Sequence, residues 1–181
     1  FRVREIPAVM HVRTTGVSMH SGLKPVLYMF RMTFSILAVW IREKILKMDE
    51  DKIRELETQG VEQKNICIVA RTHRLLDNYI SGLQNAGIKS YEIKANKTDD
   101  RSFEGIRVAT MHRVKGLEFD HVFAAAVNKK VLPFGTEADF EDGISLEEFR
   151  TGEKCLLYVA LTRARKSAYV SCYGGLSELV K

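Results

Sequence analysis

The sequence predicts a doubly wound α/β domain, with a mostly parallel sheet that is covered by helices on both faces. Residues 66–70 form a continuous apolar run, which is typical of a strand buried on both sides. Apolar residues then recur at helical spacing over residues 72–85. Strand-like runs follow at residues 106–110 and 121–127. This alternation of strands and helices favours a parallel α/β sheet over an all-α or all-β fold.

The region before residue 66 is predicted to begin the domain with a strand and a long helix. Pro25 precedes the apolar run Val26–Phe30, which we interpret as a buried strand. Apolar spacing predicts a helix over residues 32–47, and a charged helical continuation over residues 49–58 that stops before Gly60.

Residues 1–24 have no sustained periodicity. We interpret them as an irregular lead-in, an incomplete part of a neighbouring segment, so that the domain is expected to span residues 25–181. The sequence starts without an initiator Met, which indicates a piece of a longer protein. The remaining predicted elements include two strands, over residues 90–93 and 168–172. A helix is predicted over 146–161, with a capping box at 145–148. A polar loop is expected over 97–105 and an acidic, exposed loop over 137–142.

Composition indicates an ordinary globular protein of 181 residues, with 45% hydrophobic and 28% charged residues. The net charge of +5 permits a nucleic-acid partner without requiring one. Three widely spaced cysteines and no Cys/His ligand spacing argue against a disulfide framework or a structural metal site. The most apolar segment, residues 26–41, contains Arg31 and is too short to span a bilayer. We therefore expect no membrane association and a cytoplasmic location, in a bacterial-type cytosol or nucleoid.

The connection between the strand-like runs 106–110 and 121–127 is unusually rich in functional side chains. It carries Thr110, His112, Lys115, Gly116 and Glu118. Turn geometry does not require these residue types, and ligands of open α/β sheets lie at the ends of strands. The sequence therefore predicts a ligand-binding connection here, although a solvated charged loop would have a similar composition.

A second set of functional side chains follows the apolar helix segment 155–161. Arg163 and Arg165 emerge at the end of that segment, directly before a strand. A guanidinium held by a buried helix is suited to binding phosphate. The alternative is that both arginines only complement the negative end of the helix dipole.

Together the two stretches resemble motifs V and VI of UvrD/Rep-type superfamily 1 DNA helicases. Residues 110–119 match motif V, and residues 156–164 match motif VI at a suitable spacing. Val69–Thr72 is similar to the strand-end element called motif IVa. The resemblance covers residues 62–173 well and implies a RecA-like three-layer domain, the second (2A) RecA-like domain of such a helicase.

The resemblance also implies an ATP-binding role for three residues. Arg163 would reach the γ-phosphate as an arginine finger, which makes it the candidate catalytic residue. Glu118 would approach the ribose and phosphate side of the nucleotide, and Gly116 would permit a close approach of the backbone.

Single-stranded DNA is the second ligand that the resemblance implies. The residues expected to contact it are Arg71, Thr72, Thr110 and His112. Lys115 could pair with a phosphate or with a neighbouring carboxylate, and the role of Arg165 is likewise open. Cations, hydroxyl groups and a flat imidazole suit a track for a nucleic-acid strand.

The chain departs from a complete helicase because it contains no Gly-Lys dipeptide and hence no phosphate-binding loop. The acidic run 48–51 is a poor Walker B candidate because it lies in a charged helix. Phe30-Arg31 and His11–Thr15 are only weak matches to motif IV. We therefore expect ATP with Mg²⁺ as cofactor, the ion being held mainly by an absent first RecA-like domain, and no activity of this chain alone.

Two other interpretations remain open from the sequence. The chain could be a non-catalytic nucleic-acid-binding or interaction module that keeps the fold but never hydrolyses ATP. It could also come from a nuclease-linked relative, in which this domain serves a recombination or repair machine.

Overall fold

The computed structural model describes residues 24–94, 99–129, 131–135 and 143–180. The chain divides into two compact units, residues 1–39 and residues 40–181. Helix α1 (Lys24–Thr58) begins in the first unit and continues in the second. The predicted lead-in up to residue 23 and the acidic loop 137–142 lie outside the described residues.

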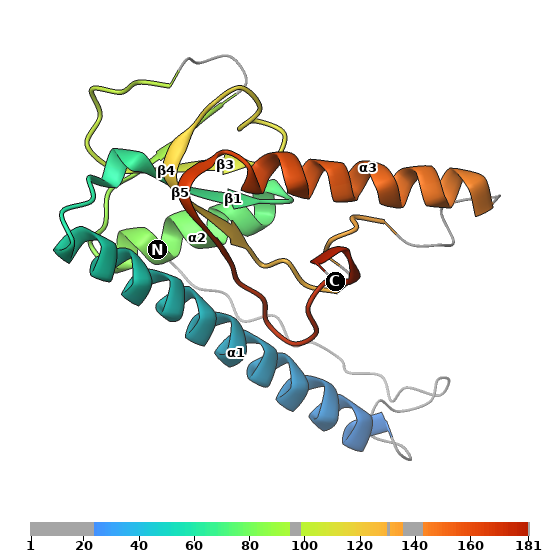
Figure 1. The fold of residues 1–181 in the computed structure, drawn as a ribbon. Helices are drawn as coiled ribbons and strands as arrows, with labels where there is room; N and C mark the ends of the chain where they lie inside the picture. The colour runs from blue at the N-terminus through green and yellow to red at the C-terminus, as the bar shows by residue number, and fades with distance from the viewer. Residues whose placement is uncertain (1–23, 95–98, 130, 136–142, 181) are drawn as a thin grey trace, which may run out of the picture. The chain divides into compact units, whose positions relative to one another are not determined.

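A five-stranded sheet forms the centre of the second unit, and all of its neighbouring strands are parallel (Figure 1). The strand order is β2-β3-β1-β4-β5. The strands are β1 (Ile66–Ala70), β2 (Ser90–Glu92), β3 (Ile106–Thr110), β4 (Phe119–Ala125) and β5 (Ala164–Val170). Every residue of β1 and β3 is buried, as expected for central strands covered on both faces. The predicted parallel α/β sheet is therefore confirmed.

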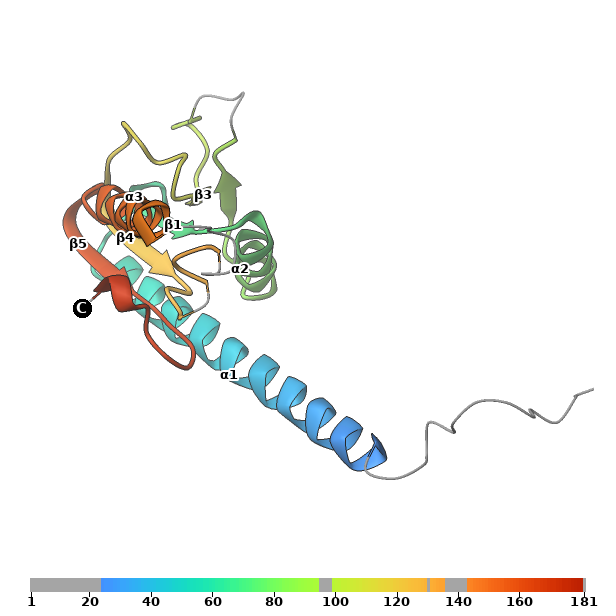
Figure 2. The same cartoon turned by 90° about the vertical axis from the view of Figure 1, so that its right-hand side faces the viewer.

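Helices cover both faces of this sheet (Figures 1 and 2). On one face, α2 (His73–Asn85) and the second half of α1 pack together in one hydrophobic cluster; on the other face, α3 (Gly143–Leu161) packs in a second cluster. Two short 3-10 helices, η1 (Gln63–Asn65) and η3 (Glu178–Val180), complete the described elements. Among the described residues, no helix combines the length and the apolar character that crossing a lipid bilayer would require.

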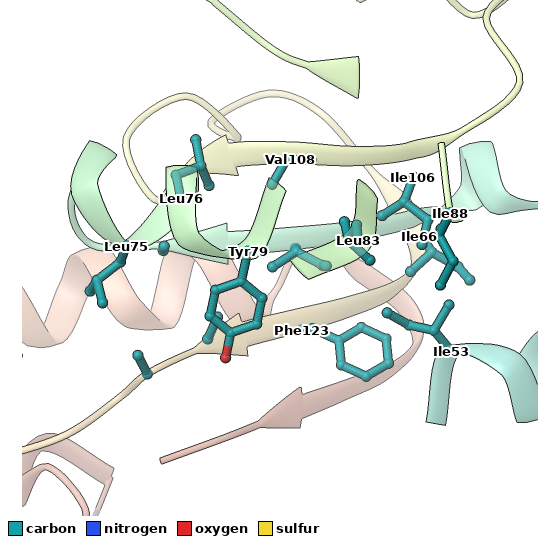
Figure 3. Close-up of a cluster of buried hydrophobic side chains, with 14 of the residues drawn as sticks. Ile53, Ile66, Leu75, Leu76, Tyr79, Leu83, Ile88, Ile106, Val108 and Phe123 are labelled. Carbon is teal, nitrogen blue, oxygen red and sulfur yellow. The ribbon is translucent and has the colours of Figure 1, made fainter. Parts of the chain in front are cut away.

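The larger cluster lies under α1 and α2, where alternate residues of the strands meet the helices. Figure 3 shows Ile53 of α1 and Tyr79 of α2 directed toward Phe123 of β4. The cluster also contains Ile66, Ile68, Leu75, Leu76, Leu83, Ile106 and Val108. Because side chains alternate between the two faces of a strand, the intervening residues of the same strands supply the other cluster.

The second cluster joins the opposite face of the sheet to α3. Val69, Ala109 and Val122 of the strands meet Leu157 and Ala160 of the helix. Residues of the connection after β3 belong to the same cluster, namely Met111, Val114 and Leu117. That connection therefore crosses the sheet on the face covered by α3.

Helix α2 begins where the sequence predicts, directly after β1. The Thr72 side chain accepts the backbone N–H of Leu75 at 3.4 Å, which caps the first turn. The helix ends at Asn85, and Gly87 follows with φ of +73°. A left-handed residue of this kind is the usual end of a helix and favours glycine.

The predicted strand at Val26–Phe30 is wrong, because these residues form the first turns of α1. Val26, Leu27, Met29 and Phe30 are exposed on that helix. Pro25 is compatible with this, since a proline in the first turn removes no helical hydrogen bond. A short apolar run does not by itself distinguish a strand from a helix.

Further element boundaries also differ from the prediction. Strand β4 occupies residues 119–125 and not 121–127. Helix α3 begins at Gly143, so Ser145 lies within its first turn and does not precede the helix. The last strand, β5, occupies residues 164–170 and not 168–172. It begins early because Ala164 pairs with Phe119 at the start of β4. Arg163 and Arg165 consequently lie at the amino end of a strand.

His121 is a buried polar residue on β4. Its Nδ1 atom lies 2.6 Å from the Ser167 hydroxyl on β5, and its Nε2 atom has no hydrogen-bond partner. Burial lowers the pKa of His121 from its ordinary value of 6.5, Asp120 opposes this change, and Lys166 and Lys52 reinforce it. The folded state therefore favours the neutral form of this histidine.

We expect the free energy of unfolding to fall as the pH is lowered from about 7 through 6.5 and toward the depressed pKa of His121. In that window the unfolded chain binds more protons than the folded chain, so stability rises with pH. His121→Gln should flatten this slope in urea denaturation measured between pH 7 and pH 5. His73→Gln makes the same substitution at an exposed histidine of α2 and is the matched control, whose slope should change less than that of His121→Gln. An unchanged slope in His121→Gln would contradict the assignment.

Candidate functional site

The connection from β3 to β4 runs from the carboxyl ends of the parallel strands to their amino ends. These two ends of the sheet are called the carboxyl edge and the amino edge below. Thr110 pairs with Ala70 at the carboxyl end of β1, whereas His121 pairs with Ile66 at its amino end. Residues 111–118 therefore begin at the carboxyl edge and finish at the amino edge. The sequence predicted that these residues lie at the carboxyl ends of strands, which is the position of His112 but not of Glu118. The candidate residues of this connection consequently belong to two edges.

The carboxyl edge brings together two of the predicted stretches. The pairing of Ala70 with Thr110 places Arg71 and Thr72, which follow β1, beside the residues that follow β3. The backbone N–H of Met111 donates to the Ala70 carbonyl oxygen at 3.0 Å and fixes this arrangement. The four residues predicted to contact DNA, which come from two separate motifs, thus lie along the carboxyl edge: Arg71, Thr72, Thr110 and His112.

Arg71 is engaged with Glu153 of α3. Its Nε and Nη2 atoms donate to the two carboxylate oxygens of Glu153, both at 2.8 Å, and both side chains are largely buried. Burial alone would raise the pKa of Glu153. The bonds from Arg71 and from the Phe134 backbone N–H, with the nearby charges of Arg71 and His112, lower it below its usual value. This two-bond geometry fixes α3 against the end of β1.

One threonine of the predicted set is hydrogen-bonded and the other is buried, whereas the histidine is exposed. Thr72 caps α2, and Thr110 is 7% exposed. The side chain of His112 is exposed at the start of the connection. Of the four residues predicted to contact nucleic acid, His112 is therefore the most accessible.

A groove of about 450 Å³ lies between the connection and α3. His112 and Lys115 line it from the connection, and Glu153 lines it from the helix. Apolar contributions come from Met111, Phe149, Leu156 and Val159. Lys115 is exposed. Among the described residues, Glu153 forms its ion pair with Arg71 and not with Lys115. The groove thus combines a flat ring and a cation with an apolar wall.

The amino edge holds a second set of charges. Arg165 donates from Nε and Nη2 to Glu118 Oε2, at 2.9 and 2.7 Å. The Phe119 backbone N–H donates to the Arg163 carbonyl oxygen at 2.9 Å, which places Arg163 beside the same carboxylate. The hydrogen bond from Arg165 lowers the pKa of Glu118, and the charges of Arg165 and Arg163 contribute. Arg165 therefore binds the Glu118 carboxylate directly, whereas Arg163 contributes only a nearby positive charge.

The side chain of Arg163 folds back onto the end of α3. Its Nε donates to the Val159 carbonyl oxygen at 3.1 Å, and its Nη2 donates to the Thr162 hydroxyl at 3.4 Å. This is the helix-end interaction that the sequence also allowed. Because Arg165 neutralises Glu118, the cluster keeps an excess positive charge on Arg163, which can bind an anion.

Gly116 is exposed and has φ of +83°. A Cβ atom at this position would meet no other atom within 4 Å, so backbone conformation and not crowding requires glycine here. The turn lets the connection reach the amino edge with Glu118 beside Arg165. Among the described residues, no group of three or more His, Cys, Asp or Glu side chains could hold a metal ion.

Sequence reasoning missed two residues of the carboxyl edge, Glu153 and Phe134. Glu153 lies on the buried side of α3, and a charged residue among Leu156, Leu157 and Ala160 is the signal that could have indicated it. Phe134 follows a proline in an irregular segment, and the sequence gives no indication of its position.

A comparison with known families matches residues 83–174 to the model of the UvrD-like helicase C-terminal domain. A putative ATP-dependent DNA helicase, YjcD of Bacillus subtilis, is 32% identical over 130 residues, which is 70% of this chain and 16% of that protein. The ATP-dependent DNA helicase PcrA of Staphylococcus epidermidis is 36% identical over 67 residues, 37% of this chain and 9% of that protein. The chain thus spans less than a fifth of the length of these relatives.

The fold is similar to a solved structure described as the C-terminal domain of a possible DNA helicase from Lactobacillus plantarum. The TM-score is 0.53 at 19% sequence identity, over 75% of this chain and 71% of that chain. This likeness concerns the fold alone and agrees with the expected RecA-like α/β arrangement. The family match covers half of the chain and includes the whole connection from β3 to β4, together with Glu153, Arg163 and Arg165. The chain therefore belongs to the family of UvrD-like helicase C-terminal domains.

Proposed function

We propose that this chain is the C-terminal motor domain of an ATP-dependent DNA helicase. In this role it completes an ATP cleft formed with a first RecA-like domain and contacts single-stranded DNA. The observation that carries the proposal is the course of residues 111–118, which join His112 at one edge of the sheet to Glu118 at the other. The names of the similar proteins, which are ATP-dependent DNA helicases, support it.

The amino edge is the proposed ATP side. Arg163 would leave the end of α3 and reach the γ-phosphate, where a guanidinium stabilises the charge that develops during phosphoryl transfer. Glu118, held by Arg165, would face the ribose and phosphate side of the nucleotide. Guanidinium groups bind phosphate oxygens and not metal ions, so Mg²⁺ would be held mainly by the first RecA-like domain.

The carboxyl edge is the proposed DNA side. His112 and Lys115 border a groove with an apolar wall, and a nucleic-acid strand needs both cations and flat surfaces. Arg71, Thr72 and Thr110 support this edge through their contacts with Glu153, Leu75 and β1. The positive net charge of the chain favours the same ligand.

The connection would couple the two ligands. Its middle residues, Val114 and Leu117, are fixed in the core under α3, while its ends are exposed at opposite edges. A displacement of Glu118 on ATP hydrolysis would thus be transmitted to His112 through a packed segment. Coupling of this kind requires two sites joined by an element with two arrangements.

His112→Ala is the experiment that tests the DNA side. We expect it to weaken binding of a short oligothymidylate to the 181-residue chain by about tenfold, the loss expected for one stacked base. Fluorescence anisotropy at low salt measures the dissociation constant, and the affinity of the unmodified chain should fall as salt is raised.

Lys64→Ala is the matched control, because this cation precedes β1 at the opposite, amino edge. Its affinity for the oligonucleotide should stay within about twofold of the unmodified chain, as expected for an exposed pair. Equal affinities for the unmodified chain and His112→Ala would remove His112 from the DNA side. No binding by the unmodified chain would count against the whole DNA contact.

A further inference from the structure

Helix α3 is packed against the sheet over its second half. Within residues 145–152 no side chain is buried, whereas Glu153, Leu157 and Ala160 are buried in the residues that follow. Among the described residues, the side chains that α3 contributes to the second hydrophobic cluster all lie within residues 156–161. The first buried residue along the described part of this helix is therefore a carboxylate, and apolar packing holds α3 mainly near its carboxyl-terminal end.

Glu153 attaches α3 to two other segments by directional bonds. The Nε and Nη2 atoms of Arg71, which follows β1, donate to its two carboxylate oxygens at 2.8 Å each, and the Phe134 backbone N–H donates to Oε2 at 3.0 Å. The side chains of Arg71 and Glu153 are 15% and 7% exposed. A two-bond pair of this kind fixes orientation as well as distance, whereas apolar packing has no preferred direction. Glu153 consequently determines how α3 lies at the carboxyl edge of the sheet.

The other end of α3 carries Arg163. The Nε atom of Arg163 donates to the Val159 carbonyl oxygen at 3.1 Å, and its backbone N–H donates to the Ala160 carbonyl oxygen at 3.3 Å. The guanidinium is therefore attached to the last turn of the helix and moves with it. Glu153 and the end of the helix at Leu161 are about 12 Å apart along the axis of an α-helix. A rotation or shift of α3 at Glu153 would thus displace Arg163 at the amino edge.

We propose that Glu153 is a positioning residue for ATP hydrolysis, which anchors α3 to Arg71 and thereby directs Arg163 toward the γ-phosphate. The inference rests on the proposed function and deepens it, because it assigns to Arg71 the task of holding α3. Glu153 lies at the carboxyl edge and does not itself meet ATP, so it acts through the helix. A displacement of about 1 Å at a catalytic group can lower a rate about 10²-fold, so a small loss of alignment should be measurable.

Glu153→Gln in the 181-residue chain tests the anchoring. The amide keeps the size of the side chain, but it has one acceptor oxygen and cannot receive both bonds from Arg71. Backbone amides of residues 145–156 should exchange hydrogen for deuterium about tenfold faster, the factor that one charged hydrogen bond supports. Protection in β1 and α2 should not change. Glu148→Gln, the same substitution at an exposed position of α3, is the matched control and should exchange as the unmodified chain does.

The action on Arg163 is measured in a longer protein that contains this chain and the first RecA-like domain. Glu153→Gln should lower the kcat of ATP hydrolysis by about 10- to 100-fold. The KM for ATP should stay within about twofold, because an arginine finger acts in the transition state. In an Arg163→Ala background the same substitution should cause no further loss, since a residue that acts through Arg163 then has nothing to position. Glu148→Gln should leave kcat unchanged.

Other results overturn the positioning role. Unchanged protection of α3 in Glu153→Gln would show that the ion pair does not hold the helix. An unchanged kcat in an otherwise active protein would remove Glu153 from the reaction and leave the proposed function in place. A further loss of kcat in the Arg163→Ala background would indicate a structural defect that does not act through Arg163. If the unmodified longer protein does not hydrolyse ATP, the proposed function fails and this role fails with it.

Discussion

Arg163→Ala is expected to lower the kcat of ATP hydrolysis by about 10³- to 10⁵-fold, the range in which arginine fingers act. The protein for this experiment joins the chain to the first RecA-like domain that the proposed function requires. Its dissociation constant for single-stranded DNA, measured without ATP, should not change. Steady-state ATPase assays and fluorescence anisotropy provide the two readouts.

The physical reason lies in the position of Arg163 at the amino edge. It is held beside Glu118 by the bond from the Phe119 N–H to its carbonyl oxygen, while Arg165 neutralises that carboxylate. Within the part of the chain that the structure describes, the Arg163 side chain donates to Val159 and Thr162 alone, and both bonds can be exchanged for a phosphate. DNA binding is assigned to the other edge, so the two activities should separate.

Lys166→Ala is the matched control for this prediction. Lys166 lies on β5 close to Arg163, is exposed, and pairs with Asp120 at 2.8 Å. Its removal should change kcat by no more than about twofold, because an exposed pair contributes little. Parallel loss of ATPase activity and DNA binding in Arg163→Ala would contradict the assigned role. A parent protein without any ATP turnover would favour the non-catalytic interaction module.

The central strands and α2 could be predicted because their local patterns and their burial agree. Residues 66–70 are apolar without interruption, and the structure buries all five between two layers of helices. Thr72 provides a cap and Gly87 a left-handed end for α2. In the N-terminal run Val26–Phe30 the apolar pattern and the burial do not agree, because these residues are exposed on a helix. The same apolar composition suits either a strand or a helix.

The site could be predicted only where the chemistry is contiguous in sequence. Thr110 to Glu118 lie on one connection, and the motif reasoning grouped them correctly as one stretch. It could not show that this stretch crosses the sheet, because the strand order is a tertiary property. The pairing of Arg71 with Glu153 joins residues 82 positions apart. Nothing local to Arg71 indicates that its guanidinium is already engaged.

Arg107 is a second charge whose role depends on tertiary contacts. In the sequence it only interrupts an apolar strand, and in the structure it is completely buried on β3. Its Nε donates to Asp99 Oδ1 at 2.9 Å. Its terminal nitrogens donate to the carbonyl oxygens of Phe103, Gly105 and Asp100, at 2.8, 2.6 and 2.6 Å. One guanidinium thus satisfies four acceptors and fixes the loop before β3 to the sheet.

Arg107→Met is expected to lower the free energy of unfolding by about 3–5 kcal/mol, the cost of leaving one member of a buried ion pair alone. Methionine keeps much of the volume but leaves the buried Asp99 carboxylate and three carbonyl groups without this donor. Urea denaturation followed by circular dichroism measures the change.

Arg101→Met is the informative control, because Arg101 pairs with the same carboxylate, at 3.5 Å, from an exposed position. Both variants remove one positive charge next to Asp99, yet only Arg107 is desolvated. Arg101→Met should therefore cost less than about 1 kcal/mol. Adding Asp99→Asn to Arg107→Met should recover part of the loss, since it removes a buried carboxylate charge that would keep only the longer pair with exposed Arg101. Equal costs for the two arginine variants would show that net charge around Asp99, and not buried hydrogen bonding, stabilises this side of the sheet.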